Sequence, residues 1–85
     1  MVKLLKTNGE IIENFTAETL KEKQDAVGGY IELVRIHDGS FLVVNEEGTF
    51  YAQLEYNENA SSLANMQIVG DAIHLTDADI STFLD

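Results

Sequence analysis

The dipeptides Asn8-Gly9 and Asp38-Gly39 constrain the fold of this chain most, because each lies between two segments with the composition of β-strands. The flanking segments are Val2–Thr7 and Glu10–Glu13 for the first dipeptide, and Tyr30–His37 and Ser40–Asn45 for the second. Asn-Gly and Asp-Gly between apolar runs are the strongest local signals for a hairpin with a two-residue turn. The sequence therefore predicts two antiparallel hairpins.

The segment Ser40–Asn45 is predicted to lie in the interior of the sheet. Residues 41–44 are all apolar, so both faces of this strand carry apolar side chains, as is typical of a strand that is covered on both sides. The other strands predicted are Thr49–Leu54, which completes a three-strand meander after a turn at Glu46-Glu47-Gly48, and Gln67–Leu75, which is interrupted at Gly70-Asp71.

Three short helices are also predicted. The first begins at Thr16, whose hydroxyl can accept a hydrogen bond from an early backbone N–H, and ends at Gly28-Gly29. The other two are Ala60–Met66, capped by Asn57 or Asn59, and a last helix that opens at Thr76-x-x-Asp79 and buries Ile80, Phe83 and Leu84.

These elements follow the order ββαβββ(α)βα and form one domain, residues 1–85, because 85 residues are too few for two cores. The predicted class is α+β, a mostly antiparallel sheet with two or three short helices on one face. The sequence contains no cysteine, so a disulfide framework is not expected. The side chains expected in the core are Ile31, Leu33, Val34, Ile36, Leu42, Val44, Ile68 and Ile73.

Negative charge is concentrated after Arg35, the last lysine or arginine of the chain. The fifty residues that follow it carry nine carboxylates, and the formal net charge of the whole chain is −10. Such a surface repels nucleic acid phosphates and anionic lipids and attracts basic proteins. We therefore expect no direct nucleic-acid binding. Glu46 and Glu47, in a turn beside Gly48, are candidate contacts for a basic partner.

Signals for export or membrane insertion are not found in the sequence. The first six residues carry a lysine at every third position and have no apolar core, unlike a secretory signal. No apolar run approaches the ~18 residues of a membrane-spanning helix. We therefore expect a protein of the cytoplasm that does not contact a membrane.

Patterns typical of catalytic or metal-binding sites are missing as well. The sequence has no cysteine and no Gly-x-Ser-x-Gly segment, and its glycine pair follows a predicted helix, whereas a phosphate-binding loop precedes one. His37 and His74 could bind a metal with Asp38 or Asp71 if their strands were neighbours, but the spacing of metal ligands on a helix is absent. The prediction is a non-enzymatic protein without a cofactor or a metal.

Arg35 is the one basic residue within a strongly predicted strand. The alternation of side chains places it on the same face as Ile31, Leu33 and His37. It either forms a cross-strand ion pair or clamps a small anionic ligand through its planar guanidinium group. The candidate ligand-binding residues are Arg35, His37, Tyr30, Tyr51 and Tyr56, of which the tyrosines can stack on a base.

Three segments together resemble those of a known family: Val27–Glu32 (VGGYIE), Val43–Gly48 (VVNEEG) and Ile68–Ile73 (IVGDAI). Over most of its length the chain is similar to a small family of uncharacterised domains from phages and bacterial plasmids. That family often has a Leu-Pro-x-Asn element after the third meander strand, where this chain has Glu55 in place of proline. The resemblance implies a phage or mobile-element protein in the cytoplasm of a host cell and assigns no catalytic residues.

Two functions fit these observations. In the first, a binding module antagonises a host process such as antiviral defence by sequestering a small anionic nucleotide signal in a pocket between subunits. In the second, the acidic surface mimics nucleic acid and docks on a basic host protein. A structural or regulatory phage component is a third interpretation. We expect a homo-oligomer, because so short a chain has little material to cover a strongly apolar central strand on both faces.

Overall fold

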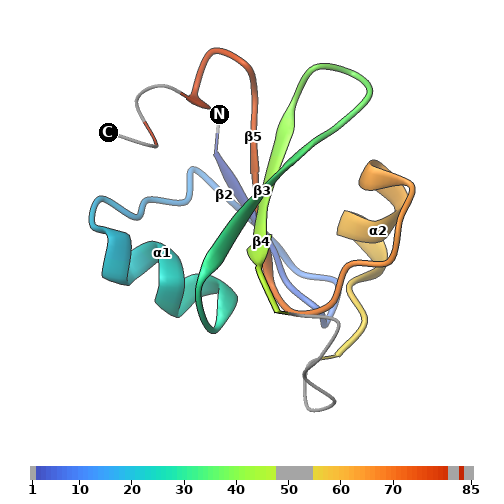
Figure 1. The fold of residues 1–85 in the computed structure, drawn as a ribbon, viewed down its shortest axis with the longest axis horizontal. Coiled ribbons are helices and arrows are strands. Elements are labelled where there is room, and N and C mark those ends of the chain that lie inside the picture. The colour runs from blue at the N-terminus through green and yellow to red at the C-terminus, as the bar shows by residue number, and fades with distance from the viewer. Residues whose placement is uncertain (1, 48–54, 81–82, 84–85) are drawn as a thin grey trace.

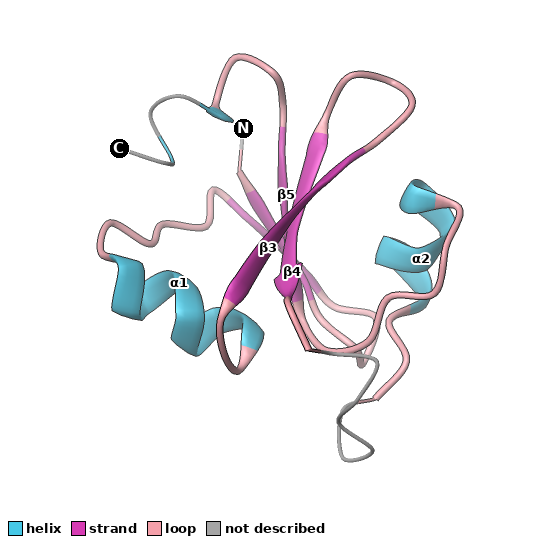
Figure 2. Cartoon of the chain, viewed as in Figure 1, coloured by secondary structure: helices cyan, strands magenta, loops and turns pink. Residues whose placement is uncertain are grey.

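The described part of the chain folds into a five-stranded antiparallel sheet flanked by two helices (Figures 1 and 2). The computed structural model describes residues 2–47, 55–80 and 83. The strands are β1 (Lys3–Leu5), β2 (Ile11–Glu13), β3 (Ile31–Arg35), β4 (Phe41–Asn45) and β5 (Ala72–Leu75), and the helices are α1 (Leu20–Val27) and α2 (Glu58–Ala64). The predicted α+β class with a mostly antiparallel sheet is confirmed.

Both predicted hairpins are present, although their turns differ from the expected type. β1 pairs with β2 and β3 pairs with β4, each in an unbroken antiparallel register. Each turn is a three-residue loop: the N–H of Gly39 donates to the carbonyl of Ile36 at 2.9 Å, and Gly39 has a φ of 92°. Gly9 takes the same place in the first hairpin, with a φ of 93°. Glycine closes such a loop because it adopts the left-handed conformation without strain.

The last strand joins the two hairpins into one sheet, whose order is β2-β1-β5-β4-β3. β5 pairs antiparallel with β1 on one side and with β4 on the other. β4 is therefore an interior strand, as its apolar residues predicted. The predicted meander placed residues 49–54 beside β4, and this prediction is wrong. The strand that pairs with β4 on the side away from β3 is β5. Residues 49–54, the expected third strand, lie outside the described part of the chain.

The two helices cover opposite faces of the sheet, which corrects the expectation of helices on one face (Figure 1). The cause is that β4 carries apolar side chains on both of its faces. Val43 packs in the core beneath α1, while Leu42 and Val44 pack in the core beneath α2. Both faces need a cover, because apolar area removed from water is the main stabilising contribution. The first core contains Leu4, Ala17, Val27, Val43, Ile73, Leu75 and Phe83, and the second contains Leu5, Ile36, Leu42, Val44, Ala60, Ile68 and Ala72.

The predicted core was correct away from β3. Five of the eight expected side chains are buried: Ile36, Leu42, Val44, Ile68 and Ile73. Ile31 and Val34 are only half-buried, and Leu33 is 43% exposed, so its predicted burial is wrong. All three belong to β3, which is the edge of the described sheet and has one neighbour, β4, among the described strands.

Thr19, and not the predicted Thr16, caps α1. The Thr19 hydroxyl accepts from the Glu22 N–H at 3.1 Å, and the Glu22 carboxylate accepts from the Thr19 N–H at 3.0 Å. This reciprocal capping box needs an acid or amide three residues after the cap, and Thr16 is followed there by Thr19 itself. The other end is as predicted, because Gly28 ends the helix in the left-handed conformation with a φ of 83°.

The second predicted helix begins at Glu58, two residues before the predicted Ala60, and at the third predicted start residues 77–79 form a turn. Asn57 caps α2, and its side-chain oxygen accepts from the Ala60 N–H at 3.0 Å. The Thr76 hydroxyl donates to the Asp79 carboxylate at 2.8 Å, and the Phe83 N–H donates to the Asp79 carbonyl at 3.0 Å, as in a helical turn. No helix in the described part of the chain is long and apolar enough to cross a membrane.

Candidate functional site

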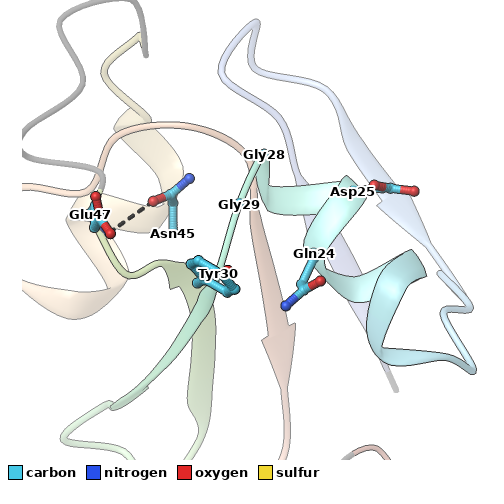
Figure 3. Close-up of a pocket in the computed structure, with 7 residues that line it drawn as sticks. All are labelled: Gln24, Asp25, Gly28, Gly29, Tyr30, Asn45 and Glu47. Carbon is cyan, nitrogen blue, oxygen red and sulfur yellow. Dashed lines mark hydrogen bonds between the residues drawn. The ribbon is translucent and has the colours of Figure 1, made fainter.

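Two adjoining cavities lie at the end of the molecule where α1 stops, β3 begins, β4 ends and the loop before β5 passes. The first has a volume of about 480 Å³ and is lined by Gln24, Asp25, Gly28, Gly29, Tyr30, Asn45 and Glu47 (Figure 3). The second has a volume of about 290 Å³ and is lined by Thr7, Asp25, Ala26, Val27, Gly28, Glu55, Gly70 and Asp71. Both include Asp25 and Gly28, so the cavities share part of their lining, and we refer to them together as one depression. We call its four carboxylates, Asp25, Glu47, Glu55 and Asp71, the acidic end.

The floor of the first cavity is fixed by a buried asparagine. Asn45 is 5% exposed; its side-chain nitrogen donates to the Val27 carbonyl at 3.2 Å, and its oxygen accepts from the Glu47 N–H at 2.8 Å (Figure 3). A Cβ atom on Gly29 would lie 2.8 Å from that nitrogen, so only glycine allows this approach. The end of α1 and the end of β4 are thereby held together. The three segments of the sequence resemblance all contribute residues to this depression.

The electrostatic character of this end favours a cation. Among the described residues that line the two cavities, four are carboxylates and none is a lysine or arginine. Outside the lining, Lys21 on α1 lies 3.3 Å from Asp25, and Lys6 lies 4.0 Å from Asp71. The last turn of α1 contains no basic residue, and the carboxyl end of a helix carries partial negative charge.

Tyr30 adds an aromatic surface to the same cavity. It immediately precedes β3 and is 68% exposed. Figure 3 shows its ring between Gln24 of α1 and Asn45 of β4. The face of an aromatic ring attracts ammonium and guanidinium groups, so Tyr30 and the carboxylates suit the same kind of ligand.

Arg35 and His37 lie at the opposite end of β3. Arg35 follows Tyr30 by five positions along the extended chain, which is about 16 Å at 3.3 Å per residue. The Arg35 guanidinium lies 5.8 Å from the centre of the Phe41 ring, its cross-strand partner. With His37 it lines a shallow depression of about 470 Å³, whose other members are Ile36, Gly39, Ala64 and Asn65.

The residues predicted to bind a ligand therefore do not lie together within one chain. Arg35 and His37 share one depression, and Tyr30 lines another. Tyr56 lies in the segment before α2, paired in an isolated bridge with Val69, and its side chain is exposed. Tyr51 lies outside the described residues. Of the predicted partner contacts, Glu47 belongs to the acidic end, and Glu46 lines a small groove of about 80 Å³ beside Glu32 and Met66.

A Ser–His–Asp arrangement occurs beside the second hairpin but has the wrong order for catalysis. The Ser40 hydroxyl donates to the Asp38 carboxylate at 2.6 Å, and His74 Nε2 lies 3.0 Å from the Ser40 oxygen. A nucleophilic serine must give its proton to histidine, whereas here the proton points to Asp38 and histidine is the donor. The hydrogen bond from Ser40 lowers the pKa of Asp38, and burial lowers the pKa of His74. The network ties the hairpin turn to β5.

The conditional metal site of the sequence analysis does not assemble. His37 follows β3 and His74 lies on β5, and β4 lies between these two strands. Asp71 accepts from the Thr7 N–H at 2.9 Å at one end of β5, while Asp38 lies at the other. No group of three or more histidine, aspartate or glutamate side chains in the described part of the chain could hold a metal ion.

Sequence reasoning missed the buried Lys23. Its side chain is 5% exposed, and its ammonium lies 4.8 Å from the centre of the Phe83 ring and 3.4 Å from the Glu18 carbonyl. It lines a cavity of about 370 Å³ between α1 and the segment that precedes it. Lys23 directly follows the exposed residues Lys21 and Glu22 on a polar helix. The local sequence therefore does not distinguish it from a lysine on the surface.

One protein-family model matches nearly the whole sequence. Residues 2–85 match the family model described as Domain of unknown function (DUF3846). The chain belongs to this family. The expectation of an uncharacterised domain family is thereby confirmed, whereas a phage or plasmid origin for this DUF3846 domain is still an interpretation. No curated protein and no solved structure matches the chain.

Proposed function

We propose that the chain is a non-enzymatic binding module whose acidic end docks on a basic partner protein. The observation that carries this proposal is the lining of the two adjoining cavities by Asp25, Glu47, Glu55 and Asp71. Four carboxylates from four different segments converge on one depression beside an exposed aromatic ring. This arrangement suits the lysine and arginine side chains of a protein surface.

The charge of the whole chain supports the same partner. At a net charge of −10, basic proteins are attracted at long range and free anions are repelled. For a protein of a phage or plasmid, as the sequence resemblance implies, the partner would be a host protein that binds nucleic acid. Occupying it would antagonise a host process such as antiviral defence.

A second candidate is the sequestration of a small anionic nucleotide signal at Arg35 and His37. The depression that these two residues line contains no carboxylate among its described members. However, Ala64 and Asn65 bring the carboxyl end of α2 to the same depression, and that end disfavours an anion. We therefore rank this function below docking on a basic protein.

The test is a comparison of two charge reversals of equal size. Glu47→Lys with Glu55→Lys changes the acidic end, while Glu13→Lys with Asp77→Lys changes exposed acids at the opposite end of β1 and β5. Both double variants alter the net charge by the same amount, so they differ only in position. Binding of a lysine- and arginine-rich peptide is measured by fluorescence anisotropy at low and moderate salt.

The proposal predicts that the acidic-end variant binds at least about tenfold more weakly, while the control changes affinity less than about threefold. Equal losses in both variants would show that only net charge matters, and would contradict docking at this end. Arg35→Ala should leave peptide binding unchanged. If Arg35→Ala instead abolishes binding of a nucleotide measured by calorimetry, the second candidate replaces the first.

A further inference from the structure

The two edges of the sheet differ in how they are protected. β2 is only three residues long, and the chain turns away from it at Asn14, which has a φ of 56°. β3 has five residues in unbroken register with β4 and contains neither proline nor lysine. Natural sheets usually protect an edge by shortness, charged side chains, proline or a bulge, and of these β3 has only the charged side chains of Glu32 and Arg35. Figure 1 shows β3 in front of β4, flanked but not covered by α1 and α2.

The hydrogen bonds of the second hairpin show which backbone groups of β3 point outward. The Ile36 N–H donates to Ser40, and the Tyr30 carbonyl accepts from Glu46, both at 2.8 Å. Bonded and non-bonded pairs alternate along an antiparallel ladder, so the even-numbered residues of β3 direct their backbone groups to β4. The odd-numbered residues, Ile31, Leu33 and Arg35, therefore direct three N–H and three C=O groups away from the sheet.

Apolar side chains accompany this edge. Six large hydrophobic side chains are exposed in the described part of the chain, and three of them, Tyr30, Leu33 and Met66, lie on β3 or next to it. Met66 lines a narrow groove with Glu32 and Val34 of β3. The edge thus offers both unsatisfied backbone groups and apolar contact area.

Charge is distributed along β3 in a way that suits pairing with itself. The start of the strand adjoins the carboxylates Asp25 and Glu47, while its end carries Arg35. In an antiparallel pair of identical strands, the start of each strand meets the end of the other. The acidic start of one copy would therefore face the basic end of its partner, at both ends of the interface.

We propose that β3 pairs antiparallel with β3 of a second copy, about a two-fold axis at Leu33. Leu33 then pairs with the partner's Leu33, and Ile31 pairs with the partner's Arg35. This register uses every outward backbone group of β3 and forms six hydrogen bonds in a continuous ten-stranded sheet. It also brings the partner's Arg35 beside Ile31, next to Tyr30, so that residues separated by the length of β3 in one chain meet across the interface.

The chain lends itself to a test with a single thiol, because it contains no cysteine. Cα atoms of a hydrogen-bonded antiparallel pair are about 5.5 Å apart, which lies within the range that a disulfide spans. Leu33→Cys should therefore form a disulfide-linked dimer on mild oxidation. Ile11→Cys is the matched control, since Ile11 is on the other edge strand and is 47% exposed against 43% for Leu33.

The proposal predicts that Leu33→Cys crosslinks at least about tenfold faster than Ile11→Cys, and that the unmodified protein sediments at twice 9.4 kDa. Leu33→Lys should produce monomers while Ile11→Lys stays dimeric, with circular dichroism confirming that both variants are folded. A monomeric unmodified protein at ~100 μM, or crosslinking of Ile11→Cys as fast as that of Leu33→Cys, would overturn the proposal. The dimer would bring the partner's Arg35 close to the acidic end, but crosslinking and peptide binding are separate measurements, so either proposal can fail alone.

Discussion

Asn57 is the residue on which the connection between α2 and the sheet most depends. It is fully buried, and its side-chain nitrogen donates to the carbonyls of Leu5 at 2.8 Å and Gly70 at 2.9 Å. Its side-chain oxygen accepts from the Ala60 N–H at 3.0 Å. One amide therefore binds three backbone groups from three separate segments, and its removal would take a buried hydrogen bond from each of them.

Replacement of Asn57 by alanine should reduce the free energy of unfolding by about 2–4 kcal/mol, measured by urea denaturation. Asn57→Asp keeps the acceptor for Ala60 but cannot donate to Leu5 and Gly70, so it should also be strongly destabilising at neutral pH. Asn59→Ala is the control, because Asn59 is half-buried within α2 and caps nothing. A loss below about half a kcal/mol in Asn57→Ala would contradict this role.

Gly29 and Asn45 form a second close contact, which leaves no room for a Cβ atom on residue 29. Gly29→Ala places its Cβ against the Asn45 side-chain nitrogen and should cost about 1–3 kcal/mol of stability. In an Asn45→Ala background the clash is removed, so the same Gly29→Ala change should cost at least about 1 kcal/mol less. A double-mutant cycle by urea denaturation measures the difference. Additive effects would show that the two residues are not coupled.

At the scale of elements, the start of α1 gives a direct comparison of two threonines. Thr19→Ala removes the capping box with Glu22 and should cost about 0.5–2 kcal/mol in thermal or urea denaturation. Thr16→Ala, at the cap position that the sequence predicted, should change stability by less than about 0.5 kcal/mol. The reverse order of these two losses would mean that the helix begins at Thr16.

The hairpin turn and β5 are coupled through His74, and this coupling should depend on pH. Burial lowers the pKa of His74 from its ordinary value of 6.5, while Asp38 opposes the shift. The unfolded chain then binds a proton at His74 at a higher pH than the folded chain does. Stability is therefore complete above pH 6.5 and falls as the pH drops through the window between the two pKa values.

The variant His74→Gln should lose this dependence while keeping a donor for the Ser40 oxygen. Between about pH 7.5 and about pH 5.5, the free energy of unfolding of the unmodified protein should fall more steeply than that of the variant. Urea denaturation at several pH values measures both slopes. Equal slopes would show that His74 does not resist protonation in the folded protein.

The sequence predicted the elements that local signals determine and failed where distant segments decide. Gly9, Gly39 and Gly28 mark turns and a helix end through their own conformations, so both hairpins and the end of α1 were predictable. The position of β5 between β1 and β4 depends on pairing over more than sixty residues of chain, which no local pattern encodes. The division of the helices between two faces follows from the apolar side chains on both faces of β4. It could be predicted only once the neighbouring strands of β4 were known.

At the scale of the whole molecule, folding brings together carboxylates that are far apart in the sequence. The sequence indicated an acidic surface and named Glu47, but it could not bring Asp25 of α1 to the same depression as Glu55 and Asp71. It also grouped Arg35 with Tyr30, which lie about 16 Å apart along β3. A set of site residues is a property of the folded chain, and here only the antiparallel pairing of β3 between two copies would reunite them.

The position at which a basic partner binds tests the central claim of docking at the acidic end most directly. A lysine- and arginine-rich peptide is titrated into isotopically labelled protein while backbone amide resonances are recorded. The largest chemical-shift changes should occur around residues 24–30, 45–47, 55 and 70–71, with small changes around the hairpin at residues 35–40. Changes centred on Arg35 and His37, or spread evenly over all acidic residues, would contradict the proposed site.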